Sequence, residues 1–178
     1  REGNWNQAIP MPLLRENDAS GIENDADFSG TVRALWEPDR VYILLEVNDD
    51  TLDTDSNQTW ERDHYSVYFD FANLKTDGHV KDEIPPMDSV MFMLEKIWSV
   101  EGNLAFGNQA PGDPIDSSLV WGIHFAEVLD TGTMYSLEMV FPLDILGVDM
   151  QENDVIGWDA KIGDSDGPGK FDGKLSWH

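Results

Sequence analysis

Apolar and polar residues alternate along several short segments of the chain, which is the period of a half-buried β-strand. Residues 40–48, RVYILLEVN, place Val41, Ile43, Leu45 and Val47 on one face. Residues 65–71, YSVYFDF, repeat the alternation with aromatic residues and a valine on one face. No segment keeps a helical period over three turns, so the pattern predicts a chain built from strands.

Turn signals join these strands into hairpins. The sequence EPDR, residues 37–40, joins strands expected at 31–36 and 40–48, and the sequence DTGT, residues 130–133, joins two strands expected within 119–141. Further strands are expected at 89–98, 154–164 and 173–177. Residues 1–29 are polar and irregular and are expected to form an entry strand plus a loop, and residues 73–88 and 103–118 are expected to be long loops.

Many short strands without a repeat period predict an all-β chain, folded as an antiparallel β-sandwich of the immunoglobulin-like or jelly-roll type. One domain accounts for all 178 residues, and a truncated final strand is compatible with the sequence. The tryptophans within strand patterns, Trp36, Trp121 and Trp158, are expected in the core.

The charge balance narrows the possible partners. The chain has 11 Lys and Arg against 35 Asp and Glu, a formal net charge of −24. Nucleic acid and anionic membrane surfaces would be repelled, whereas divalent cations such as calcium would relieve the repulsion among carboxylates. The absence of cysteine excludes disulfides and thiolate metal sites. The chain begins at Arg1, which we interpret as the start of a processed or excised segment.

Four segments carry a resemblance to a known family. Residues 32–49 (VRALWEPDRVYILLEVND), 59–70 (TWERDHYSVYFD), 133–147 (TMYSLEMVFPLDILG) and 153–177 (NDVIGWDAKIGDSDGPGKFDGKLSW) resemble the carbohydrate-binding modules of family 9 in order and spacing. That family lies among the DOMON-like β-sandwiches. The resemblance implies a non-catalytic domain that holds sugars between aromatic rings and carries structural calcium. It also implies an extracellular or periplasmic location, as part of a larger secreted polysaccharide-degrading enzyme.

The resemblance places the sugar site at Trp60, which corresponds to one of the family's two stacking tryptophans. An indole face complements the C–H face of a pyranose, and loop residues Asn57, Glu61 and Arg62 would bond the hydroxyl groups. The chain departs from the pattern at Ser66, where the family has an acidic residue, and lacks the expected arginine within 89–98.

No second stacking ring follows the segment LSW in this sequence, and Trp98 is the candidate substitute. Two interpretations of Trp60 therefore remain. Either its ring is a platform for a neutral polysaccharide or a sugar end, or it packs on the end of the sandwich while Asp63 caps a turn.

The sequence GDSDGPGKFD, residues 163–172, is the candidate calcium loop. Asp164 and Asp166 supply carboxylates two residues apart, next to glycines that permit a tight backbone. Asp159 is a further candidate ligand, and Asp49 and Asp50 are weaker ones. The alternative interpretation is a hairpin turn with solvated charges.

Functions other than sugar binding are also compatible with parts of the sequence. An accessory structural domain that has lost its sugar site keeps the same fold. A b-type haem site, known among DOMON-like relatives, would use His64 or His124 with one of the methionines Met87, Met91 and Met93. Pairs such as Glu61 with Asp63 or Glu138 lack any companion motif of a glycosidase, so no catalytic activity is expected.

Overall fold

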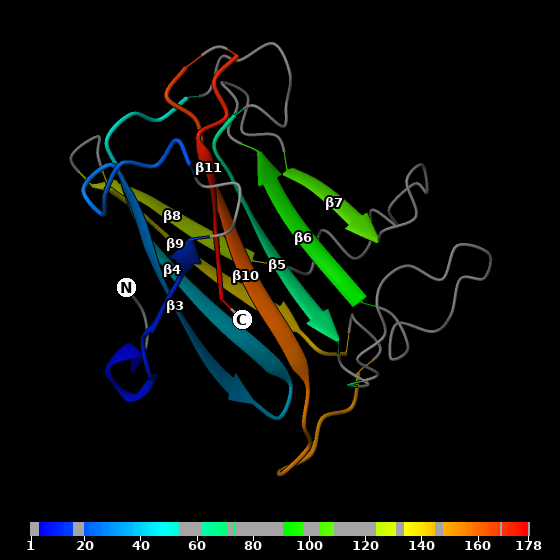
Figure 1. Ribbon diagram of the computed structural model, residues 1–178. Coiled ribbons are helices and arrows are strands. Elements are labelled where there is room, and N and C mark those ends of the chain that lie inside the picture. The colour runs from blue at the N-terminus through cyan, green and yellow to red at the C-terminus, as the bar shows by residue number, and fades with distance from the viewer. Residues whose placement is uncertain are drawn as a thin grey trace.

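The chain forms two antiparallel sheets packed face to face, as the computed structural model shows (Figure 1). Side chains are described for residues 4–15, 20–53, 62–70, 73, 134–144, 148–167 and 169–177. Residues 91–97, 104–108 and 124–130 are described as backbone strands. Within these ranges no helix is long and apolar enough to cross a membrane.

The first sheet has five strands in the order β1-β3-β4-β9-β8. Their bounds are Met11–Pro12 (β1), Phe28–Glu37 (β3), Arg40–Asp49 (β4), Met134–Pro142 (β9) and His124–Asp130 (β8). The second sheet has six strands in the order β2-β11-β10-β5-β6-β7. Their bounds are Leu14–Arg15 (β2), Gly173–Ser176 (β11), Gly157–Asp164 (β10), His64–Asp70 (β5), Met91–Ile97 (β6) and Leu104–Asn108 (β7).

The predicted fold class, an antiparallel β-sandwich, is confirmed, and so are both predicted hairpins. Two details were not predicted. Strand β7 lies inside the expected loop 103–118. The N-terminal 29 residues contain a short 3-10 helix, η1 (Trp5–Gln7), as well as β1, β2 and the start of β3.

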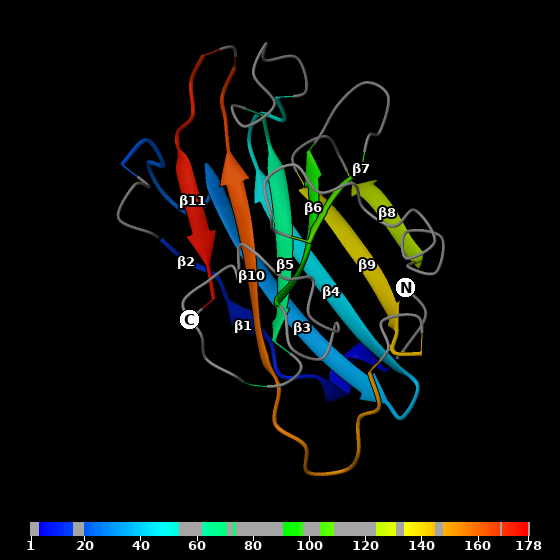
Figure 2. The same ribbon diagram turned by 90° about the vertical axis from the view of Figure 1, so that its right-hand side faces the viewer.

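The two sheets face each other (Figure 2), and the inward-facing side chains of both layers fill the space between them. In β4 the four residues predicted to share a face are all buried. Burial alternates along β9, whereas residues 64–67 of β5 are buried at four consecutive positions. Burial of such large side chains contributes about 1.5–3 kcal/mol each. The residues that these strands contribute to the core are Val41, Ile43, Leu45 and Val47 (β4), Tyr65, Val67 and Phe69 (β5), and Tyr135, Leu137, Met139 and Phe141 (β9).

The antiparallel register brings several strand ends to the same end of the sandwich. In the first sheet Phe28, at the start of β3, pairs with Asp49, at the end of β4. In the second sheet His64, at the start of β5, pairs with Gly163, near the end of β10. Short polar residues just outside these strands are therefore gathered into one region, although they are far apart in sequence.

Candidate functional site at the acidic end of the sandwich

Aspartates follow or precede four strands at this end of the sandwich, and they form two groups. In each group, one carboxylate oxygen from every member lies within 4.8 Å of the others. Four segments that are distant in sequence contribute. One group is Asp49, Asp63 and Asp164, and the other is Asp27, Asp50 and Asp166.

The first group is buried. The exposed fractions of Asp49, Asp63 and Asp164 are 2%, 0% and 1%. Asp63 accepts hydrogen bonds from two backbone amides, that of Ser165 at 2.9 Å and that of Asp53. Asp49 accepts one from the amide of Thr51 at 2.8 Å. These bonds fix the side chains at strand ends but use only part of their capacity to accept hydrogen bonds.

Three buried carboxylate oxygens in the two groups have no hydrogen-bond partner: Oδ2 of Asp49, Oδ2 of Asp164 and Oδ1 of Asp166. Within the described parts of the chain, no ion pair joins any of the six aspartates to a basic side chain. Burying carboxylates in this way is strongly unfavourable unless a positive charge or a proton neutralises them. The arrangement therefore fits a bound cation.

The pKa values of the buried group are raised. Burial, together with the neighbouring Asp49 carboxylate, raises the pKa of Asp63 to about 9 and that of Asp164 to about 8. Burial also raises the pKa of Asp49 to about 6. Without a cation the group would hold protons near neutral pH, and a divalent cation would displace them.

The second group lies closer to solvent. The amide of Asp50 donates to the carbonyl of Asp27 at 3.0 Å, which ties the loop before β3 to the end of β4. The amide of Asp166 donates to Oδ2 of Asp172 at 3.0 Å. Burial, followed by the nearby Asp172 carboxylate, raises the pKa of Asp166. Three carboxylates supply only part of the six to eight oxygens that calcium takes, and carbonyl groups or water would supply the others.

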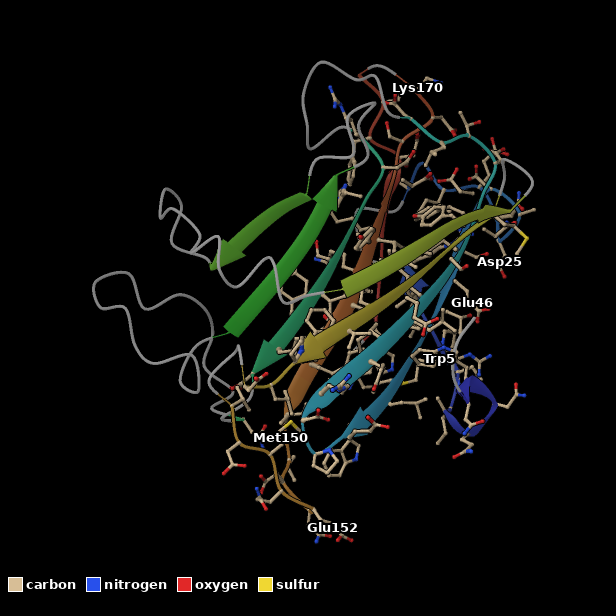
Figure 3. The ribbon with its side chains drawn as sticks, turned by 180° about the vertical axis from the view of Figure 1, so that it is seen from behind. Trp5, Asp25, Glu46, Met150, Glu152 and Lys170 are labelled. Atoms are coloured by element: carbon tan, nitrogen blue, oxygen red, sulfur yellow. The ribbon has the colours of Figure 1, made fainter. Side chains whose placement is uncertain are left out.

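The loop after β10 turns tightly. Gly167 and Gly169 have φ angles of 137° and 78°, a region that favours glycine. The amide of Lys170 donates to the carbonyl of Gly167 at 2.9 Å, and the amide of Asp172 donates to the carbonyl of Asp164 at 3.0 Å. Lys170 lies at this end of the molecule, opposite Met150 and Glu152 (Figure 3).

The structure shows where the candidate calcium ligands named from the sequence lie. Asp164 and Asp166 belong to different groups, and Asp159 belongs to neither. Asp159 lies five residues earlier on β10, opposite Tyr68, and its Oδ1 accepts the amide of Ala160 at 2.8 Å. The weaker candidates Asp49 and Asp50 lie in the two groups.

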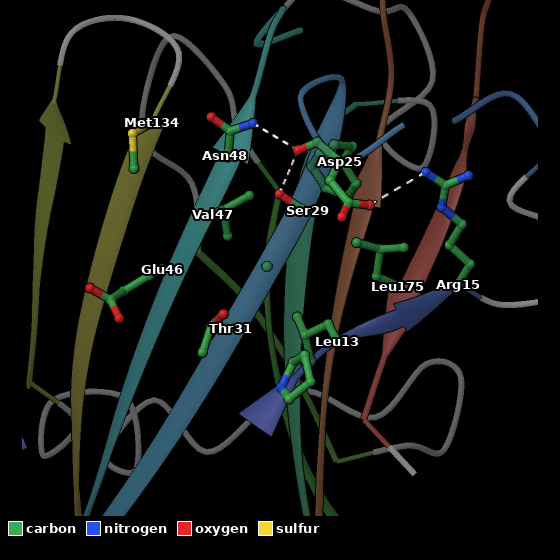
Figure 4. A pocket seen from close by; sticks show the side chains of 13 residues that line it. Leu13, Arg15, Asp25, Ser29, Thr31, Glu46, Val47, Asn48, Met134 and Leu175 are labelled. Atoms are coloured by element: carbon green, nitrogen blue, oxygen red, sulfur yellow. Dashed lines mark hydrogen bonds and ion pairs between the residues drawn. The ribbon is translucent and has the colours of Figure 1, made fainter. Parts of the chain in front are cut away.

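A hollow of about 450 Å³ near the loop that contains Asp27 is lined by residues of both sheets, among them Asn48 of β4 and Leu175 of β11 (Figure 4). At its rim, Asn48 donates to the carbonyls of Asp25 and Ala26 at 3.0 and 3.1 Å, and Ser29 donates to Asp25 at 2.7 Å. Arg15 approaches the Asp25 carboxylate at 3.7 Å. These contacts fasten the loop before β3.

Of the predicted sugar-binding residues, Arg62 is described, whereas Asn57, Trp60, Glu61 and Trp98 lie outside the described residues. The segment 54–61 starts after Asp53 and ends before Arg62. The amide of Asp63 donates to the carbonyl of Asp53 at 3.2 Å, and the amide of Asp53 donates back to the Asp63 carboxylate. The ends of the segment that carries Trp60 are thus joined at the buried aspartate group.

The structure shows what contacts His64, a candidate haem ligand, and on which strand Glu138, a candidate catalytic acid, lies. The His64 ring stacks on Phe171, with centroids 6.2 Å apart, and its Nδ1 lies 2.9 Å from the carbonyl of Arg62. Only glycine fits beside the ring, because a Cβ on Gly163 would lie 2.2 Å from its Cε1. Glu138 is on β9 of the first sheet, whereas Asp63 directly precedes β5 of the second sheet.

The comparison with protein families decides what kind of domain this is. A family model described as "Carbohydrate family 9 binding domain-like" matches residues 2–178. The chain belongs to carbohydrate-binding module family 9. The resemblance inferred from the four segments is thereby confirmed.

Relatives of this module occur within larger enzymes. It is 26% identical over 153 residues to endo-1,4-beta-xylanase A of Thermotoga maritima and 25% identical over 146 residues to the enzyme of the same name from Thermotoga neapolitana. The matches cover 86% and 82% of the module but 12% of each xylanase. The module therefore spans only a small part of the length of these relatives.

Solved structures of family 9 modules share the fold. A module from Caldicellulosiruptor kristjanssonii, in complex with glucose, superposes with a TM-score of 0.71 at 12% identity, over 99% of this chain and 78% of that one. The same organism's module in complex with cellotriose gives 0.69 at 13% identity, over 97% and 74%. At these identities the likeness concerns the fold.

Proposed function

We propose that the module binds neutral saccharides without catalysing a reaction, and that it serves as an accessory part of a larger secreted enzyme. The observation that carries this proposal is the family match over residues 2–178. The relatives support it, because two of them are xylanases. Two similar solved structures are of family 9 modules in complex with glucose and with cellotriose. An extracellular or periplasmic location accords with such a role.

The proposed sugar site is the Trp60 loop. Its neighbours Asn57, Glu61 and Arg62 provide groups that can bond hydroxyls, and Trp98 is the candidate second ring. Ser66 faces away from the core on β5, opposite Lys161 of β10 and Glu95 of β6 in the register. Charged residues therefore flank Ser66, the position at which the family's acidic residue is missing.

We also propose that the two aspartate groups each bind a calcium ion. The partnerless buried oxygens of Asp49, Asp164 and Asp166 support this proposal, as does the lack of described basic partners. Calcium would neutralise the buried carboxylates and hold together the segments that precede β5 and follow β10. At the first group its role would be structural, because Asp49, Asp63 and Asp164 are enclosed by the protein.

Replacing Trp60 tests the sugar site. We expect Trp60→Ala to weaken binding of glucose and cellotriose at least about 30-fold, the size expected when a central aromatic contact of ~2 kcal/mol is lost. Trp60→Phe, which keeps a smaller ring, should lose less. Isothermal titration calorimetry measures both, and thermal unfolding shows whether each variant folds.

Three results would contradict this site. Binding by folded Trp60→Ala at wild-type affinity would place the sugar elsewhere. Unfolding of Trp60→Ala, together with intact binding by Trp60→Phe and by variants of Asn57 and Glu61, would make Trp60 a packing residue. A folded wild-type protein that binds no neutral glycan would support the accessory domain that has lost its sugar site.

A further inference from the structure

A second hollow, of about 360 Å³, lies at the end of the sandwich opposite the aspartates. Its lining includes Trp36, near the end of β3, and Trp158, near the start of β10. The segment 150–156, which leads into β10, contributes the other side. The hollow thus opens between the ends of the two sheets, and its volume is at the small end of the range for small-molecule sites.

The walls and floor are apolar. Ile43 and Phe69, buried core residues, form part of the floor. Trp36 was expected in the core, but it is 46% exposed, and Val155 is 69% exposed. The Trp158 ring is supported by Trp177, with centroids 4.8 Å apart. Two indoles and a valine therefore present apolar surface to an open space, which costs free energy until a ligand covers it.

The rim is polar and ordered by its own hydrogen bonds. The amide of Gln151 donates to Oδ2 of Asp154 at 2.7 Å, and the amide of Asp154 donates to the carbonyl of Gln151 at 3.0 Å. Asn153 lies in the turn between them with a φ of 78°. Its side-chain amide is exposed and has no partner among the described side chains, so it can bond a ligand.

The chemistry of the lining selects the ligand. None of the described residues that line the hollow is basic, and Asp154 is at the rim, so an anion would be repelled. A sugar ring pushed toward Ile43 and Phe69 would bury hydroxyl groups without partners, which is unfavourable. A flat apolar ring with one hydroxyl group avoids both penalties, because the ring contacts the indoles and the hydroxyl reaches the rim.

We propose that this hollow binds a small neutral aromatic alcohol of the phenol class. The ring lies between Trp36 and Trp158, and the hydroxyl group bonds the exposed side-chain amide of Asn153. This site is independent of the proposed sugar site and of the aspartate groups, and the aspartate groups lie at the other end of the sandwich.

The test is a titration of the full chain with 2-naphthol, an apolar bicyclic alcohol that is neutral at pH 7, followed by NMR of the indole N–H groups. Signals are assigned with Trp36→Phe and Trp158→Phe. We expect saturable shifts of the Trp36 and Trp158 signals and at least tenfold weaker binding of the matched anion, 2-naphthoate. Asn153→Gly, which keeps the left-handed backbone, should weaken binding about threefold to tenfold through loss of one hydrogen bond.

Ala34→Leu, at a lining position, should fill the hollow and abolish binding, whereas Glu152→Gln, an exposed neighbour in the same turn, should leave it unchanged. Should Ala34→Leu fail to fold, Asn153→Gly remains decisive. The proposal is overturned if 2-naphthol does not saturate, if 2-naphthoate binds equally well, if Asn153→Gly binds like wild type, or if glucose shifts the same two signals. Trp60→Ala should bind 2-naphthol normally, so failure of the sugar site and failure of this site are distinguishable.

Discussion

Removing calcium with EDTA is expected to lower the melting temperature of the module by about 5–10 °C for each ion lost. A ligand at 100 times its dissociation constant stabilises the folded state by about 2.7 kcal/mol, and 1 kcal/mol shifts the melting temperature of a domain this size by about 2–4 °C. The physical reason is the burial of Asp49, Asp63 and Asp164 beside one another. Scanning calorimetry with and without calcium measures the shift.

Two variants on the same strand provide the comparison. Asp164→Asn removes a carboxylate of the buried group, so it should lose the share of the calcium response that comes from the ion of that group. In EDTA at pH 8 it should melt above the wild type, because an amide replaces a carboxylate that is costly to ionise. Asp159→Asn, also on β10 but in neither group, should respond to calcium like the wild type. An equal response from both variants would show that Asp164 is not a ligand.

In the absence of calcium, stability should fall as the pH rises from about 4 to about 9. The pKa values of Asp63, Asp164 and Asp49 are raised to about 9, 8 and 6 from an ordinary value of 3.8. Between these limits the native state holds more protons than the unfolded state, and the free energy of unfolding therefore decreases with pH. Calcium needs ionised carboxylates, so the stabilisation it gives should grow over the same interval.

Unfolding in urea at several pH values, with EDTA and with calcium, measures this dependence. The overall charge of −24 also opposes folding at high pH, so the slope must be assigned with variants. Asp63→Asn or Asp164→Asn should flatten the curve in EDTA, whereas Asp159→Asn should keep it. A wild-type stability in EDTA that is constant from pH 5 to 8 would be incompatible with raised pKa values in this group.

Much of the fold could be predicted because strand burial is a local property of sequence. Alternation alone located β4, β5 and β9 and their buried faces. Strand β7, LAFGN, was missed because a short edge strand with glycine and asparagine lacks that alternation. Trp36 follows the inward pattern of β3, but it lies where the sandwich ends, and a periodic pattern does not mark that point.

The sequence alone indicated only some members of the two aspartate groups. Asp164 and Asp166 stood out because they share one glycine-rich loop. Asp27 and Asp63 precede strands more than a hundred residues earlier, and only the pairing of β5 with β10 and the packing of the sheets bring them there. The available signal was an aspartate directly at a strand end, at Asp49, Asp63 and Asp164 alike, but that position is also common for solvated turns.

The central claim of this account, that the acidic end is a calcium centre, is tested most directly by counting ions. Calcium titrated into chelator-stripped protein, followed by isothermal titration calorimetry, should bind saturably with two ions per chain, one for each aspartate group. Asp164→Asn should remove one of them, and Asp159→Asn neither. Absence of saturable binding by correctly folded wild-type protein would contradict the claim.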